Sequence, residues 1–547
     1  MPTIREQALY KCRHLLSQVN RDRATQTYGC FDRRYWAWKL VDYPEATFQR
    51  NLYPLSWYLD QQPDENRIHL FETIKAGLEF ALNIQHKDGS FDQAYPNEHS
   101  YGATAFLLPD LIHAYNRIAD TFSENERSQI LKKFSRSANF LVKSKELHGF
   151  ISNHLAGAAY GLLRAFRLVG EPKFQHKSRE IVNTILANQS EEGWFMEYDG
   201  ADPGYQTLCM YYLAQIYADD PDENLKTGLE KSLRFLQYFV HPDGTFGGEY
   251  GSRRTEIFYP GGIAFLANEF PLAAAIIRKM AKAIEEEKTI TLADVDMGNT
   301  APLLSNYIHA QAVNETQESN VLLPCETEIH AEFQSAGIAV HSTPAYYAVI
   351  GGSNGGVLKV YDKKGGKLFY DDCGILGKIE NGRIISNQFT RKDNTMVWKA
   401  NACETHSAFY VLPTTIPTAL NYFLLRAANL SIMQIKVFNE WIKKLMVRLL
   451  LRAHDSVPLT RTRKIEFEQE KITISDRIEK TGRIQIEYLR QGIKFSSIHM
   501  ASSRYFFPAQ LEPKHSYSFD GEALDRSQSV TATMTIDMKN QTIVRKI

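Results

Sequence analysis

The sequence lacks an excess of charge of either sign, and it is not rich in cysteine, glycine or proline. Its 63 basic residues balance 63 acidic ones over 547 residues, which argues against a strongly basic nucleic-acid-binding protein. With 32 glycines and 20 prolines, the composition excludes a collagen-like or disordered chain. None of the six cysteines lies in a C-x-x-C pair, so we expect reduced thiols rather than a disulfide framework or a zinc site.

Long apolar runs are also missing. The N-terminus has no apolar stretch of the kind found in secretory signal peptides. The uncharged residues 407–425 include Pro413, Pro417 and several threonines, which disfavours a membrane-spanning helix there. We therefore expect a soluble protein of the cytoplasm.

The chain does contain a long series of helical patterns, which fill residues 1–315. Four breaks between them share a glycine followed by apolar or aromatic residues: Gly89, Gly149, Gly193 and Gly244. Their intervals of 60, 44 and 51 residues fit two helices and two loops each. The spacing predicts stacked helical hairpins, arranged as an open solenoid or as a closed ring.

A ring would gather the equivalent loops around one mouth. Aromatic residues of these loops would then line a cleft, and exposed loops rich in tyrosine and tryptophan are more often binding surfaces than plain connectors. The alternative interpretation is that these residues only cap the hairpins. They are Phe91, Tyr95, Trp194, Tyr198, Phe246 and Tyr250.

The pattern changes after the helical region. Residues 316–328 have no period and are predicted to be a linker. From residue 329 to 547, apolar residues alternate at period two between turn residues, which predicts an antiparallel β-sandwich. The chain is therefore expected to be an α+β multidomain protein.

Residues 427–452 interrupt the strand pattern with a helical one that is basic on one side. One interpretation is a helix that lies on an anionic membrane surface. The other, which we favour from the sequence, is an amphipathic helix packed on the sandwich. The basic residues are Lys436, Lys443, Lys444, Arg448 and Arg452.

Polar residues stand at the start of helices in two adjacent hairpins. Asn153 and His154 open one helix, and Tyr205 opens another 52 residues later, about one hairpin away. Their side chains can therefore meet in one cleft. The alternative for each is structural: Asn153 caps its helix, His154 is a satisfied core or surface histidine, and Tyr205 is a packing aromatic.

These residues and the domain order resemble the heparinase II/III-like and alginate-lyase-like polysaccharide lyases. The resemblance implies an N-terminal α/α toroid over residues 1–315, as an incomplete barrel, followed by a β-sandwich. It matches Asn153 and His154 to the family's Asn-His pair and Tyr205 to its catalytic tyrosine. It also places Arg253 and Arg254 near the cleft.

The chemistry of a uronate lyase suits these side chains. Such an enzyme removes the C5 proton beside a carboxylate and expels the oxygen at C4. Asn153 and an arginine, with His154 as a further candidate, would neutralise the carboxylate, and Tyr205 would act as acid, base or both. The remaining expected sugar contacts are Tyr259, Glu98, Tyr101 and Trp194.

The sequence departs from the family in one respect. The glycine-rich stretch from Gly351 lacks the sandwich histidine of many members, and neither His341 nor His406 fits that motif. Asp371 and Asp372 are interpreted as a turn rather than a metal site, and we expect neither a metal nor another cofactor.

The leading hypothesis is a lyase that cleaves a uronate-containing acidic glycan by β-elimination, within polysaccharide biosynthesis or remodelling. The alternatives are a uronyl C5-epimerase and a non-catalytic glycan-binding or assembly protein. The expected partner is an acidic polysaccharide or oligosaccharide and not a nucleic acid, with peripheral membrane contact through residues 427–452 as a further hypothesis.

Overall fold

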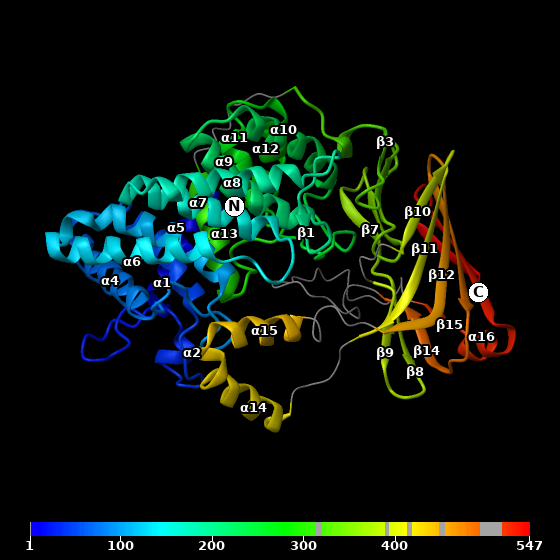
Figure 1. Ribbon diagram of the computed structural model, residues 1–547. Coiled ribbons are helices and arrows are strands. Elements are labelled where there is room, and N and C mark those ends of the chain that lie inside the picture. The colour runs from blue at the N-terminus through cyan, green and yellow to red at the C-terminus, as the bar shows by residue number, and fades with distance from the viewer. Residues whose placement is uncertain are drawn as a thin grey trace.

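A computed structural model describes residues 2–311, 320–388, 393–412, 418–447, 455–492 and 517–546. Helices form the N-terminal part and antiparallel sheets the C-terminal part, side by side in Figure 1. The six cysteines are buried and unpaired, as expected for reduced thiols. Among the described residues, no helix combines the length and the apolar character that crossing a bilayer requires.

Six inner helices of the N-terminal part contact one another in sequence around a ring, and α13 returns to contact α3. Nearest-neighbour contacts thus run around the whole circle, where we expected an incomplete one. The inner helices are α3 (Leu52–Leu59), α5 (Tyr101–Ile118), α7 (Ser152–Val169), α9 (Pro203–Asp219), α11 (Pro260–Leu266) and α13 (Met297–Ala310).

A second layer of helices covers this ring. Each outer helix buries one stripe of apolar residues; Leu225, Leu229, Leu233 and Leu236 form that stripe in α10. The short helix α2 (Arg33–Trp36) is counted in neither layer. The outer helices are α1 (Ile4–Gln18), α4 (Asp64–Asn83), α6 (Glu124–Lys143), α8 (Pro172–Ala187), α10 (Glu223–Leu236) and α12 (Pro271–Glu285).

The glycine of each repeat loop has a positive φ, from 88° at Gly244 to 132° at Gly149. At Gly89, a Cβ atom would lie 2.2 Å from the carbonyl oxygen of Arg136, so no other residue fits without a shift. Gly29 has the same geometry against Ala76, with φ 88° and the same 2.2 Å contact. It marks a first repeat that the sequence pattern did not reveal.

The C-terminal part contains two antiparallel sheets. The smaller has five strands in sequential order: β3 (Ile329–Phe333), β4 (Ile338–Ser342), β5 (Tyr346–Gly351), β6 (Val357–Asp362) and β7 (Lys367–Asp372). Asp371 and Asp372, expected in a turn, are the last two residues of β7.

The larger sheet has ten strands in the order β15-β14-β8-β9-β11-β12-β13-β16-β17, with β10 paired to β11. The short helix α16 (Gly521–Ser527) packs on it. Its strands are β8 (Ile375–Ile379), β9 (Ile384–Ser386), β10 (Thr395–Lys399), β11 (Ala402–Val411), β12 (Ser456–Phe467), β13 (Lys471–Lys480), β14 (Ile486–Gln491), β15 (Ser518–Phe519), β16 (Ser529–Asp537) and β17 (Thr542–Lys546).

Both faces of the five-stranded sheet are buried. Tyr346 and Ile350 pack against the larger sheet, whereas Tyr347 and Val349 belong to the apolar core shared with the helices. This alternation follows from the period of two along a strand. The expected α/α toroid followed by a β-sandwich is thus confirmed, with the smaller sheet between the toroid and the larger sheet.

Residues 419–447 differ from expectation. In place of one helix over residues 427–452, the structure has α14 (Ala419–Asn429), a 3₁₀ turn at Ile432–Gln434 and α15 (Lys436–Val447). The two helices lie beside the toroid (Figure 1), to which Asn439 donates a hydrogen bond at the carbonyl of Asn97. They do not follow the favoured interpretation of a helix packed on the sandwich. Arg448 and Arg452 lie outside the described residues.

Candidate functional site

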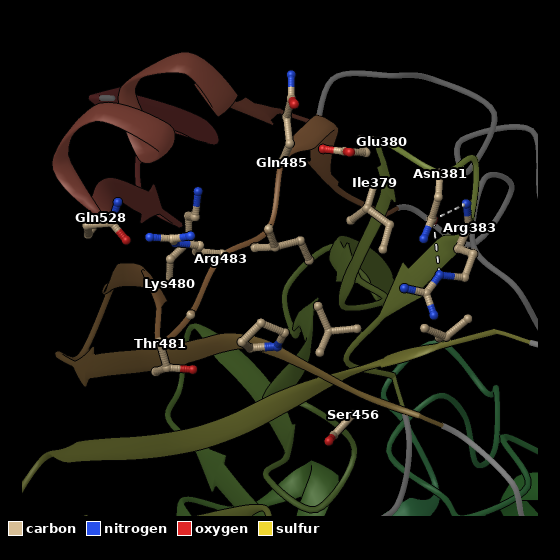
Figure 2. A pocket seen from close by; sticks show the side chains of 15 residues that line it. Ile379, Glu380, Asn381, Arg383, Ser456, Lys480, Thr481, Arg483, Gln485 and Gln528 are labelled. Atoms are coloured by element: carbon tan, nitrogen blue, oxygen red, sulfur yellow. Dashed lines mark hydrogen bonds between the residues drawn. The ribbon is translucent and has the colours of Figure 1, made fainter.

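One cavity of about 830 Å³ lies in the β domain. Figure 2 shows Lys480 and Arg483 on one side of it and Asn381 and Arg383 on the other. The lining includes no histidine or tyrosine, the two residue types that we expect to carry the acid–base chemistry. We do not place a reaction there.

A second cavity of about 830 Å³ lies at the toroid loops and is closed on one side by α15. Its lining contains more lysines than carboxylates, which suits an anionic ligand. It also contains Tyr101, one of the expected sugar contacts. The ionisable residues that line it are His86, Lys87, Asp88, His99, Tyr101, Lys143, Lys145, Glu146, His148, Glu440, Lys443 and Lys444.

Glu146 connects this cavity to His154. Its Oε2 lies 2.7 Å from Nδ1 of His154, and its Oε1 lies 2.7 Å from Nδ1 of His148. Burial by itself raises the pKa of Glu146, but the hydrogen bonds from both histidines outweigh it and hold that pKa well below its ordinary value. Since a carboxylate only accepts hydrogen bonds, each histidine carries a hydrogen on Nδ1 and leaves Nε2 for a ligand.

Asn153 is the second residue of α7 and does not cap it, since the N-cap is Ile151. Its backbone N–H donates to Oε1 of Glu197 at 2.9 Å, and its Nδ2 donates to Oε2 at 2.8 Å. Glu197 belongs to the two-stranded hairpin β1 (Met196–Glu197) and β2 (Gly200–Ala201). The carboxylate therefore fixes the amide plane of Asn153, whose second Nδ2 hydrogen is left for another acceptor.

Glu197 is itself fully buried. This burial raises its pKa well above the ordinary value, against the lowering effect of the hydrogen bonds from Asn153 and of the charge of Arg253. A buried carboxyl of this kind needs hydrogen-bond donors, and Asn153 supplies two of them.

Asp202 joins the start of α9 to the fourth repeat loop. As the N-cap residue of α9, it accepts from the backbone N–H of Tyr205 through Oδ1 at 3.0 Å. Its Oδ2 accepts from the backbone N–H of Arg253 at 2.8 Å. One carboxylate thus positions the backbone of two expected site residues.

Arg253 lies over the aromatic ring of Tyr198, with its Cζ 4.1 Å from the ring centroid. Its Nε is buried and has no hydrogen-bond partner among the described residues. A buried guanidinium N–H without an acceptor is costly in an unliganded site, and a ligand carboxylate would satisfy it.

Four of the ionisable groups described above act electrostatically on the side chain of Tyr198. Burial raises its pKa, the charge of Arg253 lowers it, and Tyr205, Glu197 and Glu146 each raise it further. All four groups therefore lie within electrostatic range of a single ring. The backbone of Tyr198 has a positive φ of 53°, an uncommon conformation for a non-glycine residue.

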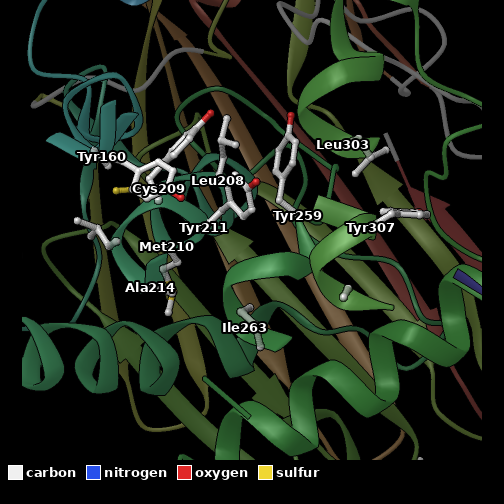
Figure 3. Packing of buried hydrophobic residues seen from close by; sticks show 14 of the residues in the cluster. Tyr160, Leu208, Cys209, Met210, Tyr211, Ala214, Tyr259, Ile263, Leu303 and Tyr307 are labelled. Carbon is white, nitrogen blue, oxygen red and sulfur yellow. The ribbon is translucent and has the colours of Figure 1, made fainter. Parts of the chain in front are cut away.

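Tyr259 and Arg254 lie deeper. Tyr259 caps α11, is 2% exposed, and packs among side chains of α9, α11 and α13 (Figure 3). Burial raises its pKa, and Tyr205 adds to this effect, so the two tyrosines are near each other. Arg254 is buried in a turn with φ 57°, where its backbone N–H donates to the carbonyl of Gly251.

Glu98 and Trp194 occupy other positions. Glu98 is buried and accepts from the backbone N–H groups of Gln93 and Ala94 within its own loop. Trp194 is 7% exposed, and its indole N–H donates to Glu192 at 3.0 Å and to Ser335 at 3.3 Å. Ser335 belongs to the β domain, so Trp194 lies at the contact between the domains. Sugar binding by either residue stays a prediction.

The β domain supports the fourth repeat loop through its glycine-rich stretch. Asn354 donates from Nδ2 to the carbonyls of Glu249 and Gly251, at 2.9 and 2.6 Å. Gly351 allows the approach, because a Cβ there would lie 2.8 Å from Cα of Tyr250. This stretch therefore holds the loop that carries Arg253.

The two β-domain histidines lie elsewhere. His341 packs against Phe467 with ring centroids 4.9 Å apart, and His406 is bonded to Glu404 and Thr462 on β11 and β12. Among the described residues, neither makes a hydrogen bond or a ring contact with the toroid residues named above.

Glu249, Asp371 and Cys373 form a group whose ligand atoms lie within 4.8 Å of one another. Nζ of Lys359 lies 2.9 Å from Oε2 of Glu249 and 3.7 Å from Oδ1 of Asp371. The ammonium therefore pairs with both carboxylates, and burial raises the pKa of the Cys373 thiol. The arrangement is that of a buried ion-pair cluster.

Comparisons with known proteins agree with this fold. Residues 18–263 match the family model of the ulvan lyase N-terminal domain. A search of curated proteins gave no match. Similar solved structures include a Paenibacillus xanthan lyase, at 11% identity and a TM-score of 0.52.

Two further structures are similar over most of this chain. They are the Streptomyces coelicolor A3 chondroitin AC lyase in complex with chondroitin sulphate (10% identity, TM-score 0.57) and heparinase III (12%, 0.51). The three alignments cover 88%, 89% and 89% of this chain, but 46%, 67% and 72% of the respective neighbours. The chain thus spans about half the length of the xanthan lyase.

At these identities the structural likeness establishes the fold alone. The expected resemblance is confirmed at its coarser level, as one to polysaccharide lyases, without specific support for an alginate-lyase-like subgroup. The chain has the toroid-and-sandwich fold of polysaccharide lyases, and its N-terminal half is similar to the N-terminal domain of ulvan lyases.

Proposed function

We propose that the protein is a lyase that cleaves a uronate-containing acidic polysaccharide by β-elimination. The observation that carries this proposal is the buried Nε of Arg253, which has no hydrogen-bond partner among the described residues. Arg253 lies within electrostatic range of Glu197, the carboxyl that binds the amide of Asn153. The second Nδ2 hydrogen of Asn153 and the Nε–H of Arg253 can both donate to a substrate carboxylate.

The first task of these groups is to neutralise that carboxylate. Asn153 donates its second Nδ2 hydrogen, and Arg253 donates Nε–H and adds its positive charge. Both are held before the substrate arrives, by Glu197 and by Tyr198 respectively. Preorganised donors of this kind stabilise the charge that develops when the neighbouring C5 proton leaves.

The second task is proton transfer. Nε2 of His154 takes the C5 proton, the electrons of the C5–H bond form the C4–C5 double bond, and the C4–O bond breaks. The hydroxyl of Tyr205 gives its proton to the departing oxygen. Glu146 keeps His154 in the tautomer with a free Nε2, and Asp202 positions the backbone of Tyr205.

The lysine-rich cavity beside Glu146 suits further anionic groups of the same polymer. The ulvan lyase match and the names of the neighbours guide the choice of substrates, so the panel is ulvan, xanthan, chondroitin sulphate and heparin. A role in biosynthesis or remodelling and a cytoplasmic location remain predictions from the sequence.

The test is the ultraviolet absorbance of the unsaturated uronate formed from this panel. We expect a rise with the wild type and a loss of roughly 100-fold or more in rate for Tyr205→Phe. Tyr217→Phe is the matched control, because Tyr217 lies on the same helix and bonds to Glu269 instead.

Two other outcomes would replace the proposal. Exchange of the C5 proton in D₂O without chain cleavage would indicate an epimerase. Binding of a glycan with equal affinity by the wild type and by Tyr205→Phe, with neither exchange nor cleavage, would indicate a non-catalytic binding protein.

A further inference from the structure

The segment of residues 419–447, which we call the helical hairpin, carries an unusual concentration of exposed apolar side chains. It holds ten of the twenty large hydrophobic residues that are exposed in the described part of the chain. Scattered single residues of this kind are ordinary, but a contiguous group marks an interaction surface. The ten are Leu420, Tyr422, Phe423, Leu424, Leu430, Ile432, Ile435, Phe438, Trp441 and Leu445.

The hairpin turns its polar side toward the protein. Asn429 and Asn439 are buried against the toroid, and Lys443 is 9% exposed. Nδ2 of Asn439 donates to the carbonyl of Asn97 at 2.6 Å, and Nδ2 of Asn97 donates to the carbonyl of Asn429 at 2.9 Å. Nζ of Lys443 donates to the carbonyl of His99 at 3.2 Å.

This arrangement is the reverse of an ordinary surface helix. Amphipathic helices of globular proteins pack their apolar stripe on the core and present polar residues to water. Here Phe423 and Trp441 are 68% and 62% exposed, while the asparagines are packed. Such a helix pair lowers its free energy only when an apolar phase covers the outer face.

A second segment extends the apolar face. Trp38 and Leu40 are 66% and 75% exposed, in a loop close in sequence to Asp42. Asp42 forms an ion pair with Arg426 of α14 at 3.1 Å. The toroid therefore adds exposed apolar residues next to the hairpin.

Charge identifies the kind of surface that fits. Residues 419–447 contain four basic residues, of which Lys443 faces the toroid, and a single acidic one, Glu440. Basic residues combined with exposed tryptophan, tyrosine and leucine suit the interface of a bilayer that contains anionic lipids. The two helices have 11 and 12 residues, too few to cross the apolar core.

We propose that the hairpin of residues 419–447 lies in the surface of an anionic lipid bilayer, with its ten apolar side chains among the acyl chains. The protein is then a peripheral membrane protein, held on the membrane by the same α15 that closes the lysine-rich cavity. This attachment does not depend on the lyase proposal, because the surface is separate from the reacting groups.

The test uses the full-length protein and vesicle flotation. One vesicle type contains equimolar phosphatidylcholine and phosphatidylglycerol, and the other contains phosphatidylcholine alone. We expect binding to the first type, weaker binding to the second, and reduced binding at high salt.

The variants Phe423→Glu and Trp441→Glu should each bind the anionic vesicles roughly tenfold or more weakly, since each removes one large apolar side chain from the bilayer. Val544→Glu is the matched control, because Val544 is 56% exposed in the β domain. Thermal unfolding curves for all three should match the wild type, because each site is exposed.

The proposal is overturned if the wild type floats with neither vesicle type, or if both hairpin variants bind as the wild type does. Sedimentation velocity supplies a further criterion. Self-association that Trp441→Glu abolishes, in a protein that ignores vesicles, would show that a second copy covers this face.

Discussion

Oε2 of Glu146 lies 2.7 Å from Nδ1 of His154, and this single contact orients the ring proposed to remove the substrate proton. The same carboxylate accepts from Nδ1 of His148 and from the backbone N–H groups of Leu147 and His148. Glu146 is therefore anchored from four donors, and its position is set before a substrate binds.

We expect Glu146→Gln to lower kcat by roughly 100-fold with little change in KM, because the amide can present a hydrogen to Nδ1 and favour the wrong tautomer. The measurement is steady-state kinetics on the active glycan of the panel. Glu440→Gln, in the same cavity lining, should retain wild-type kcat. An unchanged kcat in Glu146→Gln would remove His154 from the role of base.

The stability that Glu146 and His148 confer should depend on pH with a defined window. The hydrogen bond to Glu146 raises the pKa of His148 above its ordinary 6.5, so this contribution is full below pH 6.5 and is lost as the pH rises through the raised value. The pKa of Glu146 is lowered from 4.5, so its contribution is full above pH 4.5 and declines below it.

The difference in unfolding free energy between the wild type and Glu146→Gln should therefore be largest between pH 4.5 and 6.5. Urea unfolding at a series of pH values measures it. A difference that stays constant from acid to alkaline pH would show that neither ionisation is linked to folding.

Asn354 should couple the β domain to activity. Asn354→Ala leaves two carbonyls of the fourth repeat loop without their donor, which we expect to cost about 1–3 kcal/mol of stability. The looser loop should also lower kcat/KM, since it carries Arg253. Asn394 is a matched control, because its Nδ2 donates to Ser353 within the β domain. Asn394→Ala should lose stability while keeping kcat/KM, and an equal loss of kcat/KM in both variants would contradict the coupling.

Alanine substitutions at two glycines should distinguish the cost of backbone strain from the cost of steric overlap. Gly170 ends α7 with φ 80°, and no atom lies within 4 Å of the place that an alanine methyl would take, so Gly170→Ala should cost about 1–2 kcal/mol. Gly89 has φ 96° and the additional 2.2 Å overlap with Arg136, so Gly89→Ala should cost clearly more. Chemical denaturation gives both values. Equal costs would mean that the loop shifts freely to make room for the methyl group.

The repeat pattern could be predicted from the sequence because five hairpin loops place a glycine with positive φ at the equivalent position. The first repeat was missed, although Gly29, Cys30 and Phe31 follow the same rule. The two helices that follow this loop are short, with four residues in α2 and eight in α3, so their periodicity gave no signal.

The candidate site was only partly predictable. Helix starts pointed to Asn153, His154 and Tyr205, but the roles of Glu146 and Glu197 depend on contacts across 8 and 44 residues. A loop conformation and a two-stranded hairpin bring these carboxylates into place, and no local pattern encodes either contact. For α15, periodicity indicated an amphipathic helix but could not show which face meets the toroid.

The five-stranded sheet is buried between the toroid and the larger sheet, so we expect the two domains to unfold as a single cooperative unit. Tyr347 and Val349 would meet water if the helices were removed, and Tyr346 and Ile350 would do so if the larger sheet were removed. Calorimetry should show one melting transition for both. Recombination in evolution could then exchange neither domain alone, since a new toroid would have to fit the apolar face of the old sheet.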